Sequence, residues 1–268
     1  TYYNEGVRLA LELKNGAISQ DQYDARVAEL SGINNLSQIS KYTMQRASSQ
    51  QYNASVSGGG NNSSYFYSAS YSKENPYTKR NSGSRLNLNL SNSWKLFNWA
   101  TLSTNFAGTF YKYKDNGTAL NTLVSPRGGT IKLMPYMALA DENGNGIDYD
   151  VVNPAWTSTL GSAYKPWTYN FLQELALRDN VQKTENYSAN ISLNIPIYAG
   201  LSSSTTYAIE RSHTNGTIWY DENTYQMRYM MNYYTPIGAT TNSLGIRNGG
   251  LFKQQSENKN WTFREQLN

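Results

Sequence analysis

Residues 51–113 read QYNASVSGGGNNSSYFYSASYSKENPYTKRNSGSRLNLNLSNSWKLFNWATLSTNFAGTFYKY. Within them, Leu86, Leu88 and Leu90 alternate with polar residues, and the same alternation returns across residues 102–111. Successive side chains of a strand point to opposite faces, so this pattern predicts strands with one apolar and one polar face. The polar face carries amides and hydroxyls rather than charges. Long strands of this kind, with Tyr and Trp near their ends, are typical of a transmembrane barrel wall.

Short turns and long loops are predicted to alternate along the chain. The expected antiparallel hairpins pair residues 51–57 with 64–73, 83–95 with 100–113, and 185–195 with 201–211, and a last strand covers 260–268. Gly and Asn tolerate positive φ, so residues 58–62 are expected to form a tight turn. The long loops cover about 115–184 and 214–259. Outer-membrane barrels combine short periplasmic turns with long extracellular loops in this way.

The first 50 residues differ from the rest and are expected to form an extracellular loop region with short helices, ahead of a strand region at 51–268. The helices are predicted at 3–14 and 19–30. Ser19 with Gln22 three positions later matches a capping box at the start of the second helix. A separate apolar run at 171–178 fits either a strand start or a helix.

The composition fits a barrel wall. Of the 268 residues, 16% are charged and 38% hydrophobic, and the mean hydropathy is −0.66. The apolar surface comes from 23 Tyr, 6 Trp and 7 Phe, with less aliphatic content than a typical soluble domain. The fold class predicted is therefore all-β, an antiparallel up-and-down segment of a transmembrane barrel. An extracellular β-sandwich matches the same composition.

Several function classes are excluded by residue counts. The chain has no cysteine, which rules out a disulfide framework, a zinc–thiolate cluster and a thiol nucleophile. His213 is the only histidine, so no His-based metal cluster or catalytic triad can assemble. The net charge is +4 and the basic residues are scattered singly, unlike a nucleic-acid-binding surface. We expect no enzyme activity, no cofactor and no nucleic-acid partner.

Residues 141–146, DENGNG, match the first half of an EF-hand loop. The twelfth position of that motif should hold a bidentate Glu, but it is Val152 here. We interpret the segment as a turn-rich loop tip and predict no metal site. The ligands to test for a cation are Asp141, Asn143, Asn145 and Asp148.

The aromatic residues of the long loops are the candidate substrate-binding residues. Flat rings offer a stacking platform for sugars, and neighbouring Asn side chains can pair with hydroxyl groups. The residues assigned this role are Tyr136, Trp156, Trp167 and Trp219. The alternative is that these rings pack the loops against each other.

Three segments carry a resemblance to a known family. They are 51–59 (QYNASVSGG), 65–71 (YFYSASY) and 85–89 (RLNLN). Together they resemble the block that opens the barrel, after the plug domain, in SusC/RagA-type TonB-dependent outer-membrane transporters of Bacteroidetes. Residues 174–180 and 198–201 are similar to later segments of that family. The resemblance covers about residues 45–215.

The resemblance implies a fold and a function. Such transporters have a TonB box, a plug and a 22-stranded barrel, so about eight strands look like an internal piece of the barrel. It implies a place in the bacterial cell outer membrane, in contact with lipid, and import of oligosaccharides or peptides. It also implies a SusD-like surface lipoprotein and the TonB complex as partners. The alternative is a non-transporting extracellular β-rich glycan-binding or adhesin domain, whose Leu86, Phe106 and Ile191 would face a dry core instead of lipid.

Overall fold

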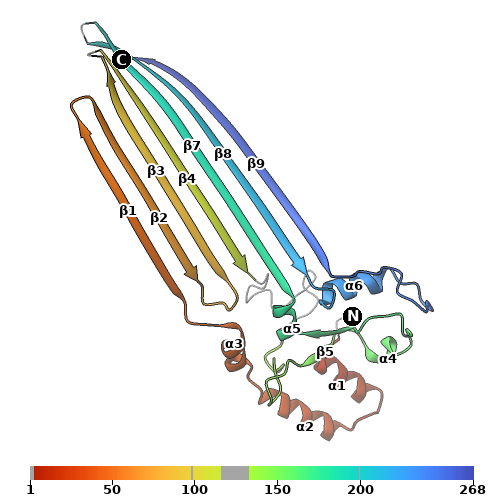
Figure 1. The fold of residues 1–268 in the computed structure, drawn as a ribbon. Helices are drawn as coiled ribbons and strands as arrows, with labels where there is room; N and C mark the ends of the chain where they lie inside the picture. Colours follow the sequence, from red (N-terminus) through yellow and green to blue (C-terminus); the bar gives the residue numbers. More distant parts are fainter. Residues whose placement is uncertain (1–2, 98, 116–132, 199) are drawn as a thin grey trace. The chain divides into compact units, whose positions relative to one another are not determined.

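A long antiparallel sheet dominates the computed structural model, which describes residues 3–97, 99–115, 133–198 and 200–268. Seven strands follow each other in the order β1-β2-β3-β4-β7-β8-β9, neighbours running in opposite directions (Figure 1). Their bounds are β1 Ser48–Gly60, β2 Ser63–Asn75, β3 Ser82–Leu96, β4 Ala100–Asp115, β7 Arg178–Tyr198, β8 Leu201–Tyr220 and β9 Gly250–Leu267. This confirms the predicted antiparallel up-and-down arrangement.

The chain divides into two compact units. The sheet unit comprises Arg46–Lys114, Val181–Thr217 and Lys253–Asn268. The loop unit comprises Thr1–Gln45, Asp115–Asn180 and Ile218–Phe252. The helices expected within residues 1–50 therefore group with both long connections. The stretch 116–132 of the predicted loop 115–184 lies outside the described residues.

The register of the sheet unit brings the apolar positions of neighbouring strands together. Ala69 of β2 lies opposite Leu88 of β3, which lies opposite Gly108 of β4. Because side chains alternate between faces, this register places most apolar positions of these strands on one face, although Phe66 and Ala107 lie on the other. The pairings predicted for 51–57 with 64–73 and for 83–95 with 100–113 are confirmed. The third predicted pair, β7 with β8, are neighbours in the sheet.

Three strands extend well beyond their predicted bounds. β9 begins at Gly250 instead of near residue 260, β8 continues to Tyr220, and β7 begins at Arg178. The loops predicted at 115–184 and 214–259 are shortened accordingly. These added strand residues are mostly polar and carry no clear alternation, so only pairing with a neighbouring strand makes them extended.

The loop unit is a mixed body of short elements. Its helices are α1 Glu5–Lys14, α2 Gln20–Ser31, α3 Leu36–Thr43, α4 Pro154–Thr157, α5 Phe171–Ala176 and α6 Tyr225–Tyr233, and a small sheet pairs β5 Asp148–Asp150 with β6 Thr168–Asn170. The predicted capping box is confirmed, since Gln22 N donates to Ser19 Oγ at 3.2 Å and Ser19 N donates to Gln22 Oε1 at 2.9 Å. The sequence analysis did not predict α3, α4, α6 or the β5–β6 pair. The run at 171–178 forms a helix, α5, followed by the start of β7.

An aromatic core holds the loop unit together. Met137, Val151, Tyr169, Phe171, Leu175 and Tyr225 are buried against one another. Tyr169 lies at its centre, with edge-to-face ring contacts to Phe171 at 4.8 Å and to Tyr225 at 5.7 Å. Asn35 connects the helical N-terminal part to this core, because its amide donates to the carbonyls of Met134 and Met137. In the described ranges no helix is both long enough and apolar enough to cross a membrane.

Candidate functional site

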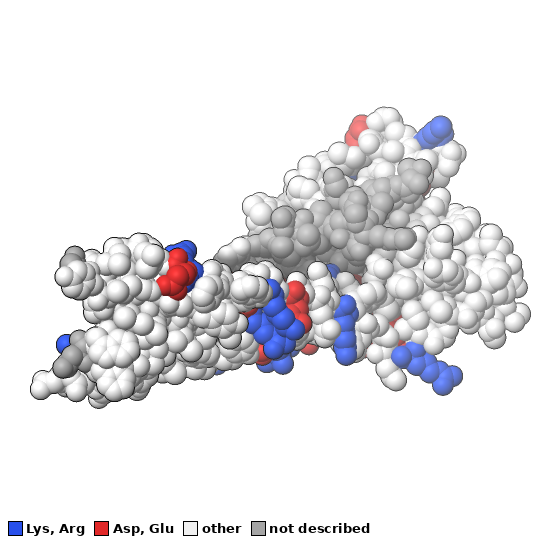
Figure 2. Space-filling view, turned by 90° about the horizontal axis from the view of Figure 1, so that it is seen from above, with Lys and Arg blue, Asp and Glu red and all other residues white. Residues whose placement is uncertain are grey.

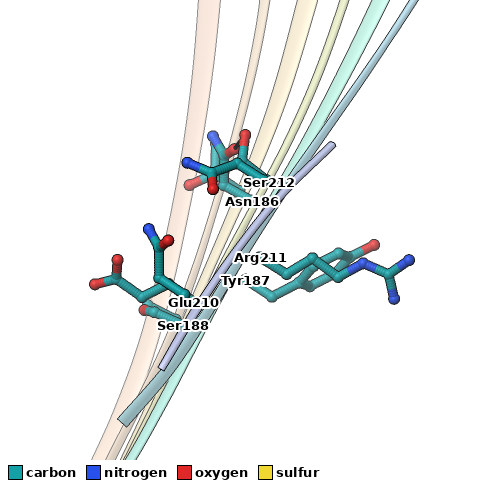
Figure 3. A pocket seen from close by; sticks show the side chains of 10 residues that line it. Asn186, Tyr187, Ser188, Glu210, Arg211 and Ser212 are labelled. Carbon is teal, nitrogen blue, oxygen red and sulfur yellow. Dashed lines mark hydrogen bonds between the residues drawn. The ribbon is translucent and has the colours of Figure 1, made fainter. Parts of the chain in front are cut away.

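The two faces of the sheet unit have different chemistry. Around one pocket of about 280 Å³, the side chains of Asn186, Ser188, Glu210 and Ser212 lie on one side of the sheet, and Tyr187 and Arg211 lie on the other (Figure 3). Charged side chains form only small groups on the surface seen in Figure 2, with uncharged residues between them. We call the side that carries Asn186, Ser188 and Ser212 the polar face, and the side that carries Tyr187 the apolar face.

The polar face is cross-linked by its own side chains. Ser91 Oγ donates to Asn105 Oδ1 at 2.8 Å, and Ser212 Oγ donates to Asn186 Oδ1 at 2.7 Å. The hydroxyls of Ser192 and Thr206 lie 2.9 Å apart on the same face. Such cross-strand pairs stabilise the sheet and leave a surface that water can wet.

The apolar face is not covered within the sheet unit. Among the described apolar side chains of this unit, only Ala100 is buried, at 7% exposure. Ile191 is 52% exposed and Trp261 is 71% exposed. Leu86, Leu88 and Leu90 share this face with Phe106, and each is exposed or only half-buried. The described residues of the sheet unit therefore form no dry core of the kind that a β-sandwich has.

The loop unit carries a continuous series of aromatic rings, which we call the aromatic row. Its members are Trp156, Trp167, Tyr229, Tyr233 and Tyr234, and successive ring centroids lie 6.0, 6.0, 6.1 and 5.1 Å apart. Trp156, at one end, is 47% exposed and Tyr234, at the other, is 59% exposed, whereas Trp167 lies between two other rings. Both ends of the row therefore present ring surface to solvent.

The structure separates the four candidate residues named from the sequence. Trp156 and Trp167 lie together in the aromatic row. Tyr136 is half-buried and packs against the core of the loop unit, which fits the packing alternative. Trp219 lies in β8 with 38% exposure, and no ring contact among the described residues joins it to the row.

Two polar side chains of α6 hold the backbone on either side of Trp167. The Arg228 guanidinium donates to Pro166 O at 2.5 Å and to Thr168 O at 2.8 Å. Asn232 accepts from Lys165 N at 2.8 Å and donates to Lys165 O at 2.9 Å. Because the segment 165–168 is fixed to α6 in this way, the ring of Trp167 is positioned against Tyr229. The sequence analysis singled out Trp167 but neither Arg228 nor Asn232, although Tyr225, Tyr229 and Tyr233 recur at helical spacing.

A buried carboxyl group connects α5 with α6. Glu174 Oε1 accepts a hydrogen bond from the backbone N–H of Tyr225, the first residue of α6, at 2.5 Å. Burial raises the pKa of Glu174 to about 7, although the nearby Arg228 and Arg178 partly oppose this. Burial also lowers the pKa of the Arg228 guanidinium. Both charged groups thus lie in a poorly hydrated environment at the start of α6.

Within the segment 141–146, the Asp141 carboxylate receives its hydrogen bonds from the segment itself. Asp141 accepts from Asn145 N at 2.8 Å and from Asn145 Nδ2 at 3.2 Å, and these bonds hold the pKa of Asp141 below its usual value. This geometry is that of a closed turn. Over the part of the chain that the structure describes, no group of three or more His, Cys, Asp or Glu residues is placed to hold a metal ion.

Comparison with known proteins gives a likeness in fold. No protein-family model matches this chain, and no curated protein sequence matches it. A chain of the RagAB peptide importer in its closed-closed state is similar, with a TM-score of 0.52 and 16% identity over 72% of this chain. A chain of the RagAB peptide transporter gives a TM-score of 0.51 and 17% identity over 72% of this chain. The matched region is 20% of each of those chains, so this chain corresponds to about a fifth of their length.

Proposed function

We propose that this chain forms part of the barrel wall and extracellular loops of a SusC/RagA-type importer in the bacterial outer membrane. The observation that carries the proposal is the exposed apolar face of the sheet unit, on which Ile191 and Trp261 are largely uncovered. Antiparallel sheets of soluble proteins pack their apolar face on a core, and large exposed apolar patches mark contact with a membrane or a partner. Lipid is the environment that this face fits.

The dimensions of the apolar face support the same proposal. On β3 the apolar positions run from Leu86 to Leu96, which is about 34 Å at the rise of an antiparallel strand. A strand tilted by about 45° then crosses roughly 24 Å, close to the apolar band of outer-membrane barrels. Phe97 and Trp99 follow at the hairpin turn, stacked at 5.7 Å and exposed, as aromatic girdles are.

The transport role rests on the resemblance of residues 51–89 to SusC/RagA-type proteins and on the fold shared with the RagAB chains. The polar face then lines the barrel interior, and the aromatic row meets an oligosaccharide or peptide outside the cell. We propose a SusD-like surface lipoprotein and the TonB complex as partners, and no enzymatic role. The alternative, a secreted adhesin or glycan-binding domain, is disfavoured because its sheet would need a second layer over residues such as Ile191.

These 268 residues contain no cysteine, so single cysteines introduced here, with any cysteine elsewhere in the full-length protein replaced, test the lipid-facing assignment. Ile191→Cys and Asn190→Cys are neighbours on opposite faces of β7, and each would be placed in the full-length protein in its membrane. We expect a membrane-soluble maleimide to label Ile191→Cys, and a membrane-impermeant maleimide to leave it unmodified. Asn190→Cys, the matched control, should not react from the lipid phase. Rapid labelling of Ile191→Cys from water would contradict the proposal.

A further inference from the structure

The apolar face of the sheet unit contains a groove with a basic rim. Phe106, Ala189, Tyr207, Ile209 and Trp261 line a pocket of about 480 Å³, and Arg211 and Lys259 lie on its border. Both cations are exposed, and Glu257 lies between them, 2.5 Å from Arg211 and 3.2 Å from Lys259. One carboxylate therefore balances only one of these two positive charges.

A second pocket lies further along β7, β8 and β9. It measures about 250 Å³ and is lined by Lys183, Lys253, Asn215, Thr217 and Gln255 among others. Each of these residues lies an even number of positions from Tyr187, Arg211 or Lys259 on the same strand. Because side chains alternate between faces, they lie on the apolar face. Two ammonium groups, amides and a hydroxyl are the donors that bind phosphate oxygens. No ion pair involves Lys183 or Lys253 among the described residues.

The basic residues lie at one end of the apolar face only. On β2 and β4 the face continues past Tyr71 and Phe110 to Lys73 and Lys112, both exposed. The anionic side chains at this end are Glu185, which accepts from the Tyr187 hydroxyl, Glu257, and Asp179, which lies on the same face of β7 as Lys183. At the hairpin-turn end, the charged residue of this face within the described strands is Glu265, which accepts from Ser203 and Thr205. The cations thus mark one boundary of the apolar band.

We propose that the groove and the second pocket together bind an anionic membrane lipid. An acyl chain would lie in the groove beside Ala189 and Ile209, and the phosphate headgroup would lie among Lys183, Lys253 and Arg211. This inference rests on the proposed function, because it requires the apolar face to be in lipid. Long basic side chains at a membrane boundary keep their stems on apolar surface and their charges at the headgroup level. Each such charge strengthens binding to an anionic surface by roughly fivefold.

The test compares lipids retained by the full-length protein after extraction into detergent and incubation with equal amounts of phosphatidylglycerol and phosphatidylcholine. Native mass spectrometry should show wild-type protein with phosphatidylglycerol bound preferentially. We expect the double variant Lys183→Gln/Lys253→Gln to lose this preference by on the order of tenfold or more. The matched control is Lys95→Gln/Arg264→Gln, which removes the same charge from the opposite face and should keep the preference.

A second variant tests the groove without changing charge. Ala189→Trp fills the space between Tyr207 and Ile209 and should reduce lipid retention, whereas Ala107→Trp on the polar face should not. Unchanged phosphatidylglycerol preference in the lysine variant, or displacement of the lipid by millimolar inorganic phosphate, would overturn the inference. If Ile191→Cys is still labelled from lipid in that case, the wall assignment stands and only the lipid site fails. Labelling of Ile191→Cys from water would instead remove the proposed function.

Discussion

Arg228 shows how a single side chain can fix the conformation of a loop. It is buried in α6, and its guanidinium donates to the carbonyls of Asn223, Pro166 and Thr168. The guanidinium holds five donors on three nitrogens in a fixed planar fork, so it reaches three separate carbonyls at once, whereas the three donors of a Lys ammonium all lie on one nitrogen. Without Arg228, the carbonyls of Pro166 and Thr168, on either side of Trp167, would lose these hydrogen-bond donors.

We therefore predict that Arg228→Lys destabilises the loop unit. The expected loss is about 2–3 kcal/mol, because hydrogen bonds from a charged group to buried carbonyls are lost. Urea-dependent hydrogen exchange of the α6 amides measures it. Arg247→Lys, an exposed substitution in the same unit, is the control and should change the exchange free energy by less than about 0.5 kcal/mol. Equal effects of the two substitutions would show that the three carbonyl bonds do not hold α6.

Glu174 gives the loop unit a dependence on pH. Its pKa is about 7 in the folded unit, against 4.5 for an ordinary Glu, so the folded state keeps a proton that the unfolded state has lost between these values. Stability is therefore highest below about pH 4.5, falls as the pH rises, and levels off above pH 7. The total change is on the order of 3 kcal/mol.

We predict that Glu174→Gln removes most of this dependence. Gln keeps an oxygen for the Tyr225 N–H but never ionises, so the variant should be more stable than wild type at pH 8 and similar at pH 5. The measurement is the free energy of exchange of the α5 and α6 amides at both pH values, corrected for intrinsic exchange rates. Glu142→Gln changes an exposed carboxylate in the same unit and should leave the wild-type profile unchanged. A wild-type stability that rises from pH 5 to pH 8 would contradict the assignment.

At the scale of elements, strands with alternating side chains were predictable and elements fixed by tertiary contacts were not. β3 and β4 alternate along most of their length, so the sequence predicts both their type and their pairing. The first part of β9 is polar on both faces, and only pairing with β8 makes it a strand. α6 is rich in Tyr and Met and resembles a strand by composition, but Thr224 caps its N-terminus and Tyr225, Met227 and Met231 are buried in the unit.

The two faces of β7 should respond differently to the same charge. Ile191 lies on the exposed apolar face and Asn190 on the polar face. In a barrel wall, a Lys on the lipid side costs about 2–4 kcal/mol near the middle of the membrane. We predict that Ile191→Lys strongly reduces assembly of the full-length protein and that Asn190→Lys is tolerated. Heat-modifiable electrophoretic mobility measures the assembled fraction, and equal yields of the two variants would contradict a lipid-facing Ile191.

Gly249 determines how the chain enters β9. Its φ is +85°, and a Cβ atom there would lie 1.9 Å from the carbonyl oxygen of Tyr220. We predict that Gly249→Ala lowers the free energy of unfolding by roughly 2 kcal/mol or more. Two effects contribute: the left-handed backbone is strained for Ala, and the new Cβ atom displaces Tyr220. The expected signature is loss of exchange protection at Gly250 and Leu251. Gly245→Ala, where a Cβ meets open space, is the control and should keep that protection.

At the scale of the whole chain, the site was harder to infer than the fold. The sequence identifies aromatic residues in the long connections, but which rings meet depends on α6 and on the clamp at residues 165–168. Two tyrosines of the aromatic row, Tyr229 and Tyr233, come from α6, a helix that was not predicted, and Tyr234 follows directly after it. Tyr136, chosen on the same grounds as Trp156, packs against the core instead. Burial, which decides between a binding and a packing role, is a property of the folded unit.

If the proposed function holds, the exposed end of the aromatic row should contribute to ligand uptake by the full-length protein. Trp156 is 47% exposed and, among the described residues, its ring contact to the row is with Trp167, so its removal should leave the other rings in place. Stacking on one aromatic ring is worth roughly 1–3 kcal/mol by analogy with nucleic-acid bases. Trp156→Ala should therefore weaken uptake or binding of the oligosaccharide or peptide about tenfold, with assembly unchanged.

Two further substitutions make that result interpretable. Trp167→Ala removes a ring packed between Trp156 and Tyr229, so it should lower uptake and also the exchange protection of α6. Tyr198→Ala, at an exposed ring beside the β7–β8 turn, should change neither quantity. Uptake measured with a labelled ligand, together with exchange protection of α6, separates loss of stacking from loss of structure. If Trp156→Ala takes up ligand at the wild-type rate, the exposed end of the row has no part in binding and the rings serve to pack the loop unit.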